Sequence, residues 1–526
     1  MILSPHHLLL AALLHSATQV AAVHLNLRGQ LGAPSVSALQ RRSHISGLDN
    51  GQNINYYTNI TLGGDEFSVM IDTGSSDLWV AGNVSNAKDM GVSTEVDYAI
   101  GSAGGPIKTA QLEFAGYKVS DQAFLQITPS SSHKKGEGLV GLGPNIGSNI
   151  WSKLGQKSSG DAVVDRVFRQ NTSTSNFISV LLGRSDDPDE KFPGDLTIGE
   201  LISGYENVTS QPKLNVTEVS SKDSSIQHWQ VLLDPYGVVG PDGQAIKLTS
   251  SVSSTKNNKQ LTAMFDTGFT LPQVPKAMAD AIYSRFDGAK YKNVTGVGAV
   301  WTLPCDIEVN VTIKIGGRPY PVHPLDTNMD LDIEVAGQKT CIGSFQPITS
   351  AATSTYDMIL GMAFLRNAYL LVNYGDFLEG SNSSTANPYV QILSTTNDTA
   401  EAHDDFVQVR LDGVDKTGDQ RLSASNTTSP DPSNNNGNNT SGSDSFFDRH
   451  KTAIIIAASV AGGLVVLGTL ATVALCLGRK RRLASSARPS VYRPLYEPAP
   501  AGEMQQVQGY QAGTRYNNPW EQRPAH

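Results

Sequence analysis

Short apolar runs separated by Gly, Pro, Asn and Asp dominate the chain from about residue 43 onward. Runs at residues 67–71, 230–233 and 309–315 have the length of strands and are bounded by turn residues. Helical spacing of apolar residues is rare, and its best example covers residues 276–286, directly after Pro275. The pattern therefore predicts a mainly β architecture.

Two other apolar segments lie near the ends of the chain. Residues 8–14, followed by small residues up to Ala22, predict a signal peptide at residues 1–22. Residues 453–477 carry no charge, and at ~1.5 Å per residue such a helix crosses a hydrocarbon core of ~30 Å. Basic residues at 479–482 follow it, so the positive-inside rule predicts one transmembrane helix with type I topology.

Changes in composition divide the rest of the chain. Residues 23–42 end in Arg41-Arg42 and read as a short prosegment. The body is expected to form an N-terminal lobe at 43–212 and a C-terminal lobe at 213–398. Residues 399–452 are rich in Ser and Asn and predict a disordered, glycosylated stalk, because they offer little apolar surface to bury. Residues 478–526 are expected to form a cytosolic tail.

Glycosylation motifs of the form N-x-S/T test this topology, and every one precedes the predicted transmembrane helix. The candidate sites are Asn59, Asn83, Asn171, Asn207, Asn215, Asn293, Asn310, Asn382, Asn397, Asn426, Asn438 and Asn439. Their distribution favours a luminal or extracellular body. We expect the cell surface, with a vacuolar or endosomal membrane as the alternative. In such an oxidising compartment Cys305 and Cys341 are expected to form a disulfide.

Composition excludes several classes of function. With 526 residues and 39% hydrophobic residues, the chain can bury a large core. A formal net charge of -9 argues against a nucleic-acid surface. The chain has three cysteines, and His133, His228 and His323 stand in unlike contexts, so neither a metal site nor a serine triad is indicated. We expect no cofactor, and we expect the protein to be a monomer.

An internal repeat carries the candidate chemistry. Residues 67–74 and 261–268 each place an apolar strand before the sequence Asp-Thr-Gly. The aspartates of the two copies are Asp72 and Asp266. A second apolar element with Gly follows each copy, at residues 138–142 and 358–362. Two related lobes are implied, each directing one carboxylate into the cleft between them. Two carboxyl groups at such a short distance share one proton. The ionised group can then act as a base toward a water molecule, and the protonated group can act as an acid.

These motifs resemble the pepsin-like aspartic protease family, in particular its membrane-anchored fungal members, over about residues 55–397. The resemblance implies a bilobal fold with an active-site cleft, polypeptide substrates and catalysis by Asp72 and Asp266. It also implies supporting roles around the two aspartates and in a hairpin, the flap, that covers the cleft. The residues expected to support the pair are Thr73, Gly74, Ser75, Thr267 and Gly268. The residues expected in the flap and substrate cleft are Tyr98, Trp79, Gly101 and Ser102.

One residue departs from this pattern. Phe269 follows Gly268 where the family usually has a hydroxyl or small residue, so a donor to the outer oxygen of Asp266 is missing. We expect an aspartic endopeptidase with an acidic pH optimum. The alternative is a catalytically inactive cell-surface glycoprotein that binds peptides or wall polymers in the same cleft.

Overall fold

The computed structural model describes residues 55–98, 101–170, 175–185, 187–188, 193–294, 298–335, 338–348, 355–375 and 387–423, with only the backbone of 23–26, 28–30, 331–335 and 338. The predicted signal peptide, the Arg41-Arg42 pair, the transmembrane helix and the cytosolic tail lie outside these residues. Within the described part, no helix is long and apolar enough to cross a membrane.

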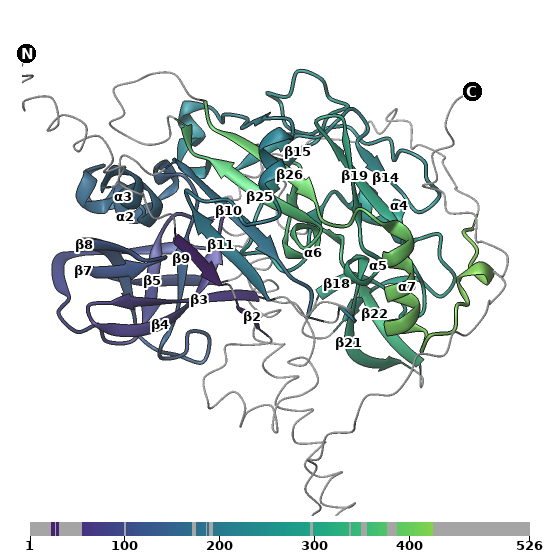
Figure 1. Ribbon diagram of the computed structural model, residues 1–526, viewed down its shortest axis with the longest axis horizontal. Coiled ribbons are helices and arrows are strands. Elements are labelled where there is room, and N and C mark those ends of the chain that lie inside the picture. The colour runs from purple at the N-terminus through teal and green to yellow at the C-terminus, as the bar shows by residue number, and fades with distance from the viewer. Residues whose placement is uncertain are drawn as a thin grey trace, which may run out of the picture.

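The N-terminal lobe is built on an eight-stranded sheet with the order β2-β3-β4-β9-β5-β8-β7-β6. Its strands are β2 (Arg28–Gln30), β3 (Asn55–Leu62), β4 (Asp65–Asp72), β5 (Leu78–Ala81), β6 (Lys88–Asp97), β7 (Ser102–Phe114), β8 (Tyr117–Ile127) and β9 (Glu137–Gly141). Helices α2 (Asn149–Lys153) and α3 (Val163–Gln170) lie beside this sheet (Figure 1).

The C-terminal lobe contains three smaller sheets and most of the remaining helices (Figure 1). The strands are β13 (Gln230–Leu232), β15 (Thr262–Phe265), β24 (Met358–Leu360), β16 (Gln273–Val274) and β23 (Gln346–Pro347) in one sheet; β14 (Val238–Val239), β19 (Val311–Ile315) and β20 (Arg318–Val322) in another; and β17 (Lys290–Val294), β18 (Gly298–Pro304), β22 (Gln338–Gly343) and β21 (Asn328–Val335) in the third. The helices are α4 (Lys276–Tyr283), α5 (Pro324–Thr327), α6 (Met362–Leu365) and α7 (Thr399–Arg410).

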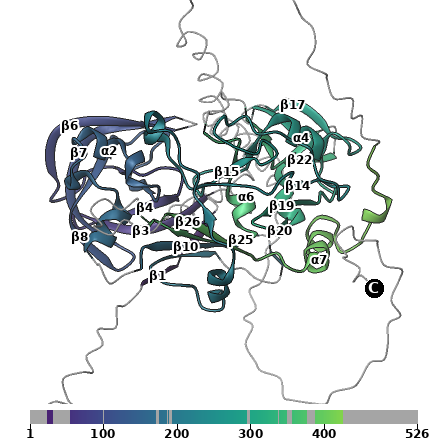
Figure 2. The same ribbon diagram turned by 90° about the horizontal axis from the view of Figure 1, so that it is seen from above.

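A six-stranded antiparallel sheet joins the two lobes, and Figure 2 shows its strands β10 and β25 between them. Its order is β1 (Val23–Asn26), β11 (Gly194–Ile198), β10 (Phe177–Leu182), β25 (Ala368–Asn373), β26 (Tyr389–Ser394) and β12 (Leu214–Asn215). β10 and β25 come from the two halves of the chain and pair directly, with Val180 opposite Leu370. β1 and β2, from the expected prosegment, form edge strands of two sheets.

The internal repeat has the same strand arrangement in both lobes. β4 runs parallel to β9, and β15 runs parallel to β24, so each Asp-Thr-Gly strand lies beside the apolar element that follows it in sequence. All four strands are almost fully buried at the ends nearest the aspartates. Burial on both faces explains why these segments read as continuous apolar runs.

One hydrophobic core cluster extends through both lobes. The indole N–H of Trp229 in the C-terminal half donates to the carbonyl of Leu142 in the N-terminal half at 2.9 Å. The Tyr374 hydroxyl donates to the same carbonyl at 2.6 Å, and its ring packs edge-on against Trp229. The lobes therefore share a core and a set of polar ties.

A buried ionic cluster adds to the lobe interface. Arg184, after β10, and Arg366, after α6, both bind the carboxylate of Asp326, at 2.5 and 2.6 Å. Burial would raise the pKa of Asp326, but the two guanidinium groups outweigh it and hold that pKa below its usual range. The ionised Asp326 thus connects segments far apart in the chain.

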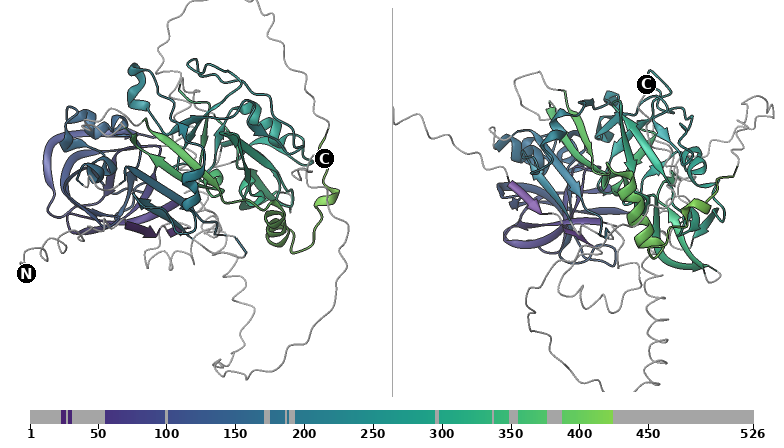
Figure 3. Two further views of the ribbon diagram at one scale, coloured as in Figure 1. Left: turned by 45° about the horizontal axis from the view of Figure 1, so that its top comes forward. Right: turned by 45° about the vertical axis from the view of Figure 1, so that its right-hand side comes forward.

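The prediction of a disordered stalk at 399–452 is wrong for its first residues. Residues 399–410 form helix α7, which lies against the C-terminal lobe (Figure 3), and residues 411–423 also belong to the described structure. The Asp398 carboxylate caps this helix by accepting from the N–H groups of Ala400 and Glu401. Phe406 is fully buried in a cluster with Leu325. Capping and this apolar contact offset the polar composition that suggested disorder.

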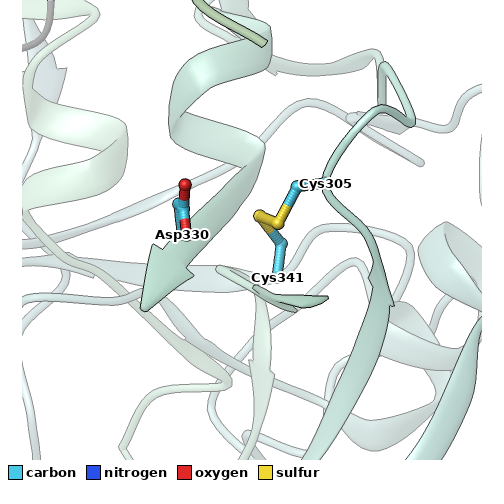
Figure 4. A group of neighbouring side chains, drawn as sticks. All are labelled: Cys305, Asp330 and Cys341. Atoms are coloured by element: carbon cyan, nitrogen blue, oxygen red, sulfur yellow. A yellow bond between two sulfur atoms is a disulfide. The ribbon is translucent and has the colours of Figure 1, made fainter. Parts of the chain in front are cut away.

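The expected disulfide between Cys305 and Cys341 is present and joins the turn after β18 to β22 (Figure 4). Asp330 lies beside the two sulfurs, but each sulfur is bonded to the other. Arg410 at the end of α7 donates to Cys341 Sγ at 3.1 Å and lies 3.5 Å from Asp330. The disulfide and Asp330 therefore form a contact site for helix α7. Because both sulfurs are in the disulfide bond, they are not thiolates that could bind a metal ion.

Replacement of Phe406 tests the role of α7. Phe406→Ala leaves a cavity under the helix and is expected to lower the free energy of unfolding by about 3 kcal/mol. Val409→Ala, on the exposed side of the same helix, is expected to change it by less than about 0.5 kcal/mol. Chemical denaturation measures both. Equal effects of the two variants would show that α7 does not contribute to the folded lobe.

His403 predicts how pH affects the attachment of α7. Its Nδ1 lies 2.9 Å from Glu308 and its Nε2 3.6 Å from Asp415, and the hydrogen bond to Glu308 raises the pKa of His403. A raised pKa adds stability that is complete below the unfolded value of about 6.5 and is lost as pH rises through the folded value. Wild type should therefore lose an increment of stability as pH rises above about 6.5 that His403→Gln lacks. Parallel melting curves across this range would contradict the assignment.

Candidate active site

Asp72 and Asp266 lie at equivalent places in the two lobes. Asp72 is the last residue of β4, and Asp266 directly follows β15. The second apolar element of each repeat fixes the backbone there: Leu142 N–H donates to the Asp72 carbonyl at 2.7 Å, and Asp266 N–H donates to the Leu360 carbonyl at 3.1 Å. Both side chains are nearly buried, with 4% and 3% of their surface exposed. The repeat thus brings both aspartates to the lobe interface, as expected.

The two carboxyl groups lie close enough to affect each other's pKa, and glycines make this approach possible. A Cβ at Gly74 would lie 2.1 Å from an oxygen of Asp266, and a Cβ at Gly268 would lie 2.5 Å from an oxygen of Asp72. Both distances are far inside van der Waals contact. Glycine is therefore required at each position by the carboxylate of the opposite lobe.

Two buried threonines lock the aspartate turns together across the interface. Thr73 N–H donates to Thr267 Oγ1, and Thr267 N–H donates to Thr73 Oγ1, both at 3.0 Å. Each hydroxyl in turn donates to the strand of the other lobe, Thr73 to the Phe265 carbonyl and Thr267 to the Ile71 carbonyl. These four bonds form a closed, nearly symmetric set. They hold the two turns in one relative position.

The hairpin between β6 and β7 reaches this site through Tyr98. The Trp79 indole N–H donates to the Tyr98 hydroxyl at 2.9 Å, and Ser75 lies close enough to the Tyr98 side chain to affect its pKa. Tyr98 N–H donates to the Gly101 carbonyl at 2.9 Å and closes the turn. The Ser102 hydroxyl donates to Glu95 on the neighbouring strand. Gly101 and Ser102 therefore shape the hairpin, while Tyr98 contacts the group that holds Asp72.

Burial controls the protonation of these groups. It raises the pKa of Asp72, against the Ser75 hydroxyl and the Gly74 N–H, which both favour the ionised form. Burial and then the charge of Asp72 raise the pKa of Asp266 well above its usual value. Burial and the nearby charges of Asp72 and Asp77 likewise keep Tyr98 protonated. The pair can hold one proton in acid, with one carboxylate and one carboxylic acid in contact.

Two neighbours of the site were not predicted from the sequence. Asp77 is buried and accepts from Ser148 and from two backbone N–H groups at the start of α2, so it supports the loop after Asp72. His228 lies close enough to the Gly74 backbone for it to affect the histidine pKa, and its ring packs edge-on against Tyr356. Burial lowers the pKa of His228 to about 4. Asp77 stands five residues after Asp72, but nothing in the sequence connects His228 with Gly74.

Removal of one interface hydroxyl predicts a loss of stability. Thr73→Val leaves the Thr267 N–H and the Phe265 carbonyl without partners in a dry interface, at a cost of about 3 kcal/mol. Thr312→Val is the matched control, because Thr312 is buried and its hydroxyl has no hydrogen-bond partner within the described structure. The control should be neutral or stabilising. Denaturation curves that rank the two variants in the opposite order would contradict the role of the threonine pair.

Known proteins resemble this chain over the region that holds the site. The model of the family described as eukaryotic aspartyl protease matches residues 55–378. Major aspartyl peptidase 1 of Cryptococcus neoformans var. grubii is 26% identical over 379 residues, covering 65% of this chain and 73% of its own. Human cathepsin D is 26% identical over 362 residues, covering 61% and 79%. The structure of the aspartic proteinase from Irpex lacteus aligns with a TM-score of 0.51 at 17% identity, covering 73% of this chain and all of the other, and so supports the fold. The chain belongs to the eukaryotic aspartyl protease family.

Proposed function

We propose that this chain is an aspartic endopeptidase that works best in acid and cleaves polypeptides bound in extended form between its lobes. The observation that carries the proposal is the pair of buried carboxyl groups, Asp72 and Asp266, in mutual contact and each fixed by its own backbone. Two such groups with one proton between them supply a base and an acid at the same point.

The reaction needs no covalent intermediate. The ionised carboxylate takes a proton from a water molecule, whose oxygen attacks the amide carbonyl carbon of the substrate. The protonated carboxyl group donates to the carbonyl oxygen, and the leaving nitrogen is protonated as the bond breaks. Tyr98 on the hairpin would cover the substrate, because its hydroxyl already lies at Ser75 beside Asp72. Chemistry of this kind explains an acidic optimum, since the pair must hold one proton.

We further propose a type I membrane protein at the cell surface, with its catalytic body outside the cytosol. Seven of the candidate glycosylation sites fall within the described structure. Six of them are exposed and Asn310 is half-buried; the exposed ones are Asn59, Asn83, Asn207, Asn215, Asn293 and Asn397. Their exposure, and the disulfide between Cys305 and Cys341, support a body that passes through the secretory pathway. Asn171, Asn382, Asn426, Asn438 and Asn439 lie outside the described residues.

The second candidate function is peptide binding without cleavage. Phe269 is the observation that favours it, because the residue after Gly268 has no hydroxyl to offer Asp266. Against it, both aspartates, both glycines and the complete threonine set are in place. The two functions differ in turnover and share the cleft.

Cleavage of an internally quenched peptide library by the purified full-length chain separates these functions. We expect activity between about pH 3 and pH 7 that peaks in acid and is blocked by a statine-type inhibitor. Asp72→Asn and Asp266→Asn should each reduce kcat/KM by about a thousandfold or more, while Asp121→Asn, at an exposed site, should leave it unchanged. A folded protein that binds the inhibitor but cleaves nothing would establish the binding function instead.

A further inference from the structure

The two catalytic carboxyl groups accept equivalent hydrogen bonds from the backbone. Gly74 N–H donates to Asp72 Oδ1 at 2.8 Å, and Gly268 N–H donates to Asp266 Oδ1 at 2.7 Å. The next N–H in each turn, that of Ser75 or Phe269, also favours the ionised form of its own aspartate. The repeat therefore gives both groups a matched pair of backbone donors.

One side-chain donor breaks this symmetry. The Ser75 hydroxyl donates to Asp72 Oδ2. At the equivalent place in the other lobe stands Phe269, a half-buried residue without a hydroxyl. Its backbone is fixed, since its carbonyl accepts from Met362 N–H at 2.7 Å. Residue 269 thus has the position of Ser75 but cannot make the bond that Ser75 makes.

A hydroxyl that donates to a carboxylate stabilises its ionised form. Among the described residues, a side-chain hydroxyl donates to Asp72 and none donates to Asp266, so the ionised form is favoured at Asp72. Resting on the proposed function, with Asp72 as the base and the shared proton on Asp266, we infer that Phe269 extends activity toward neutral pH. Phe269 acts here as a positioning residue for the proton and takes no part in bond making.

This assignment gives a balanced reaction. Asp72 takes a proton from water, the water oxygen bonds to the carbonyl carbon, and Asp266 gives its proton to the carbonyl oxygen. The resulting gem-diol loses one hydroxyl proton to Asp266 while Asp72 gives its proton to the leaving nitrogen and the C–N bond breaks. Both carboxyl groups return to their starting states. Activity ends at high pH when Asp266 ionises, and the missing hydroxyl at residue 269 delays that step.

The other titratable groups near the pair do not produce this asymmetry. Tyr98, from the hairpin, remains protonated because burial and neighbouring carboxylates raise its pKa. His228, before β13, is neutral above about pH 4, where its lowered pKa lies. Asp77 is the remaining acid that faces Tyr98, and burial raises its pKa. All three are the same in any variant of residue 269, so their effects cancel in a comparison.

The test compares Phe269→Thr with Phe269→Val in the full-length protein, because the two side chains have nearly the same shape and differ in one hydroxyl. The pH profile of kcat/KM is measured for both. The alkaline limb of Phe269→Thr should lie about one pH unit below that of Phe269→Val, the scale of one added hydrogen bond to a carboxylate. Coincident alkaline limbs would overturn the inference.

Binding of a statine-type inhibitor, measured by calorimetry across the same pH range, gives a second readout that does not depend on turnover. Affinity should also fall at lower pH in Phe269→Thr than in Phe269→Val. If the wild type cleaves with a bell-shaped profile and the two variants behave alike in both assays, only the inference fails. If the wild type neither cleaves nor binds the inhibitor, the proposed function fails and the inference with it.

Discussion

The reciprocal hydrogen bonds of Thr73 and Thr267 are the constraint on which the rest of the site depends. They join two turns that come from different halves of the chain, and they do so in an interface from which water is excluded. Because the turns are held together, the carboxyl groups of Asp72 and Asp266 must share space that suits one negative charge. Burial raises the pKa of both groups, and the charge of Asp72, held close by the joined turns, raises the pKa of Asp266 further.

The supporting structure serves the same interface at increasing distance. Leu142 receives donors from Trp229 and Tyr374 and so connects the loop after β9 to the C-terminal half. Farther from the aspartates, Asp326 forms ion pairs with two arginines. The six-stranded sheet contains strands from both halves of the chain. Hydrophobic burial stabilises the lobes, whereas these polar ties specify how one lobe sits against the other.

Much of this arrangement was predictable because the repeat is local in sequence. Asp72 and Asp266, their glycines and threonines, and the strands that carry them can be read from residues 67–74 and 261–268, and the structure brings them together. The helix expected at residues 276–286 is α4, and its last turn ends earlier, at Tyr283. The disulfide followed from the small number of cysteines and the expected compartment.

The remainder depends on contacts between residues far apart in sequence. Helix α7 was missed because its polar composition resembles that of the stalk, although Asp398 followed by Glu401 is a capping signal. Its stability comes from Phe406 under Leu325 and from His403 at Glu308, 95 residues away. The contact of His228 with Gly74 likewise leaves no local pattern. Sequence periodicity reports which face of an element is buried and does not identify the partner.

The central claim is that Asp72 and Asp266 hold one proton between them while the enzyme is active. Difference infrared spectroscopy of the wild type against Asp266→Asn, recorded at the pH of maximal activity, tests it directly. The account predicts one buried carboxylic acid carbonyl band in the wild type that is lost in Asp266→Asn. Two such bands, or none, would contradict it.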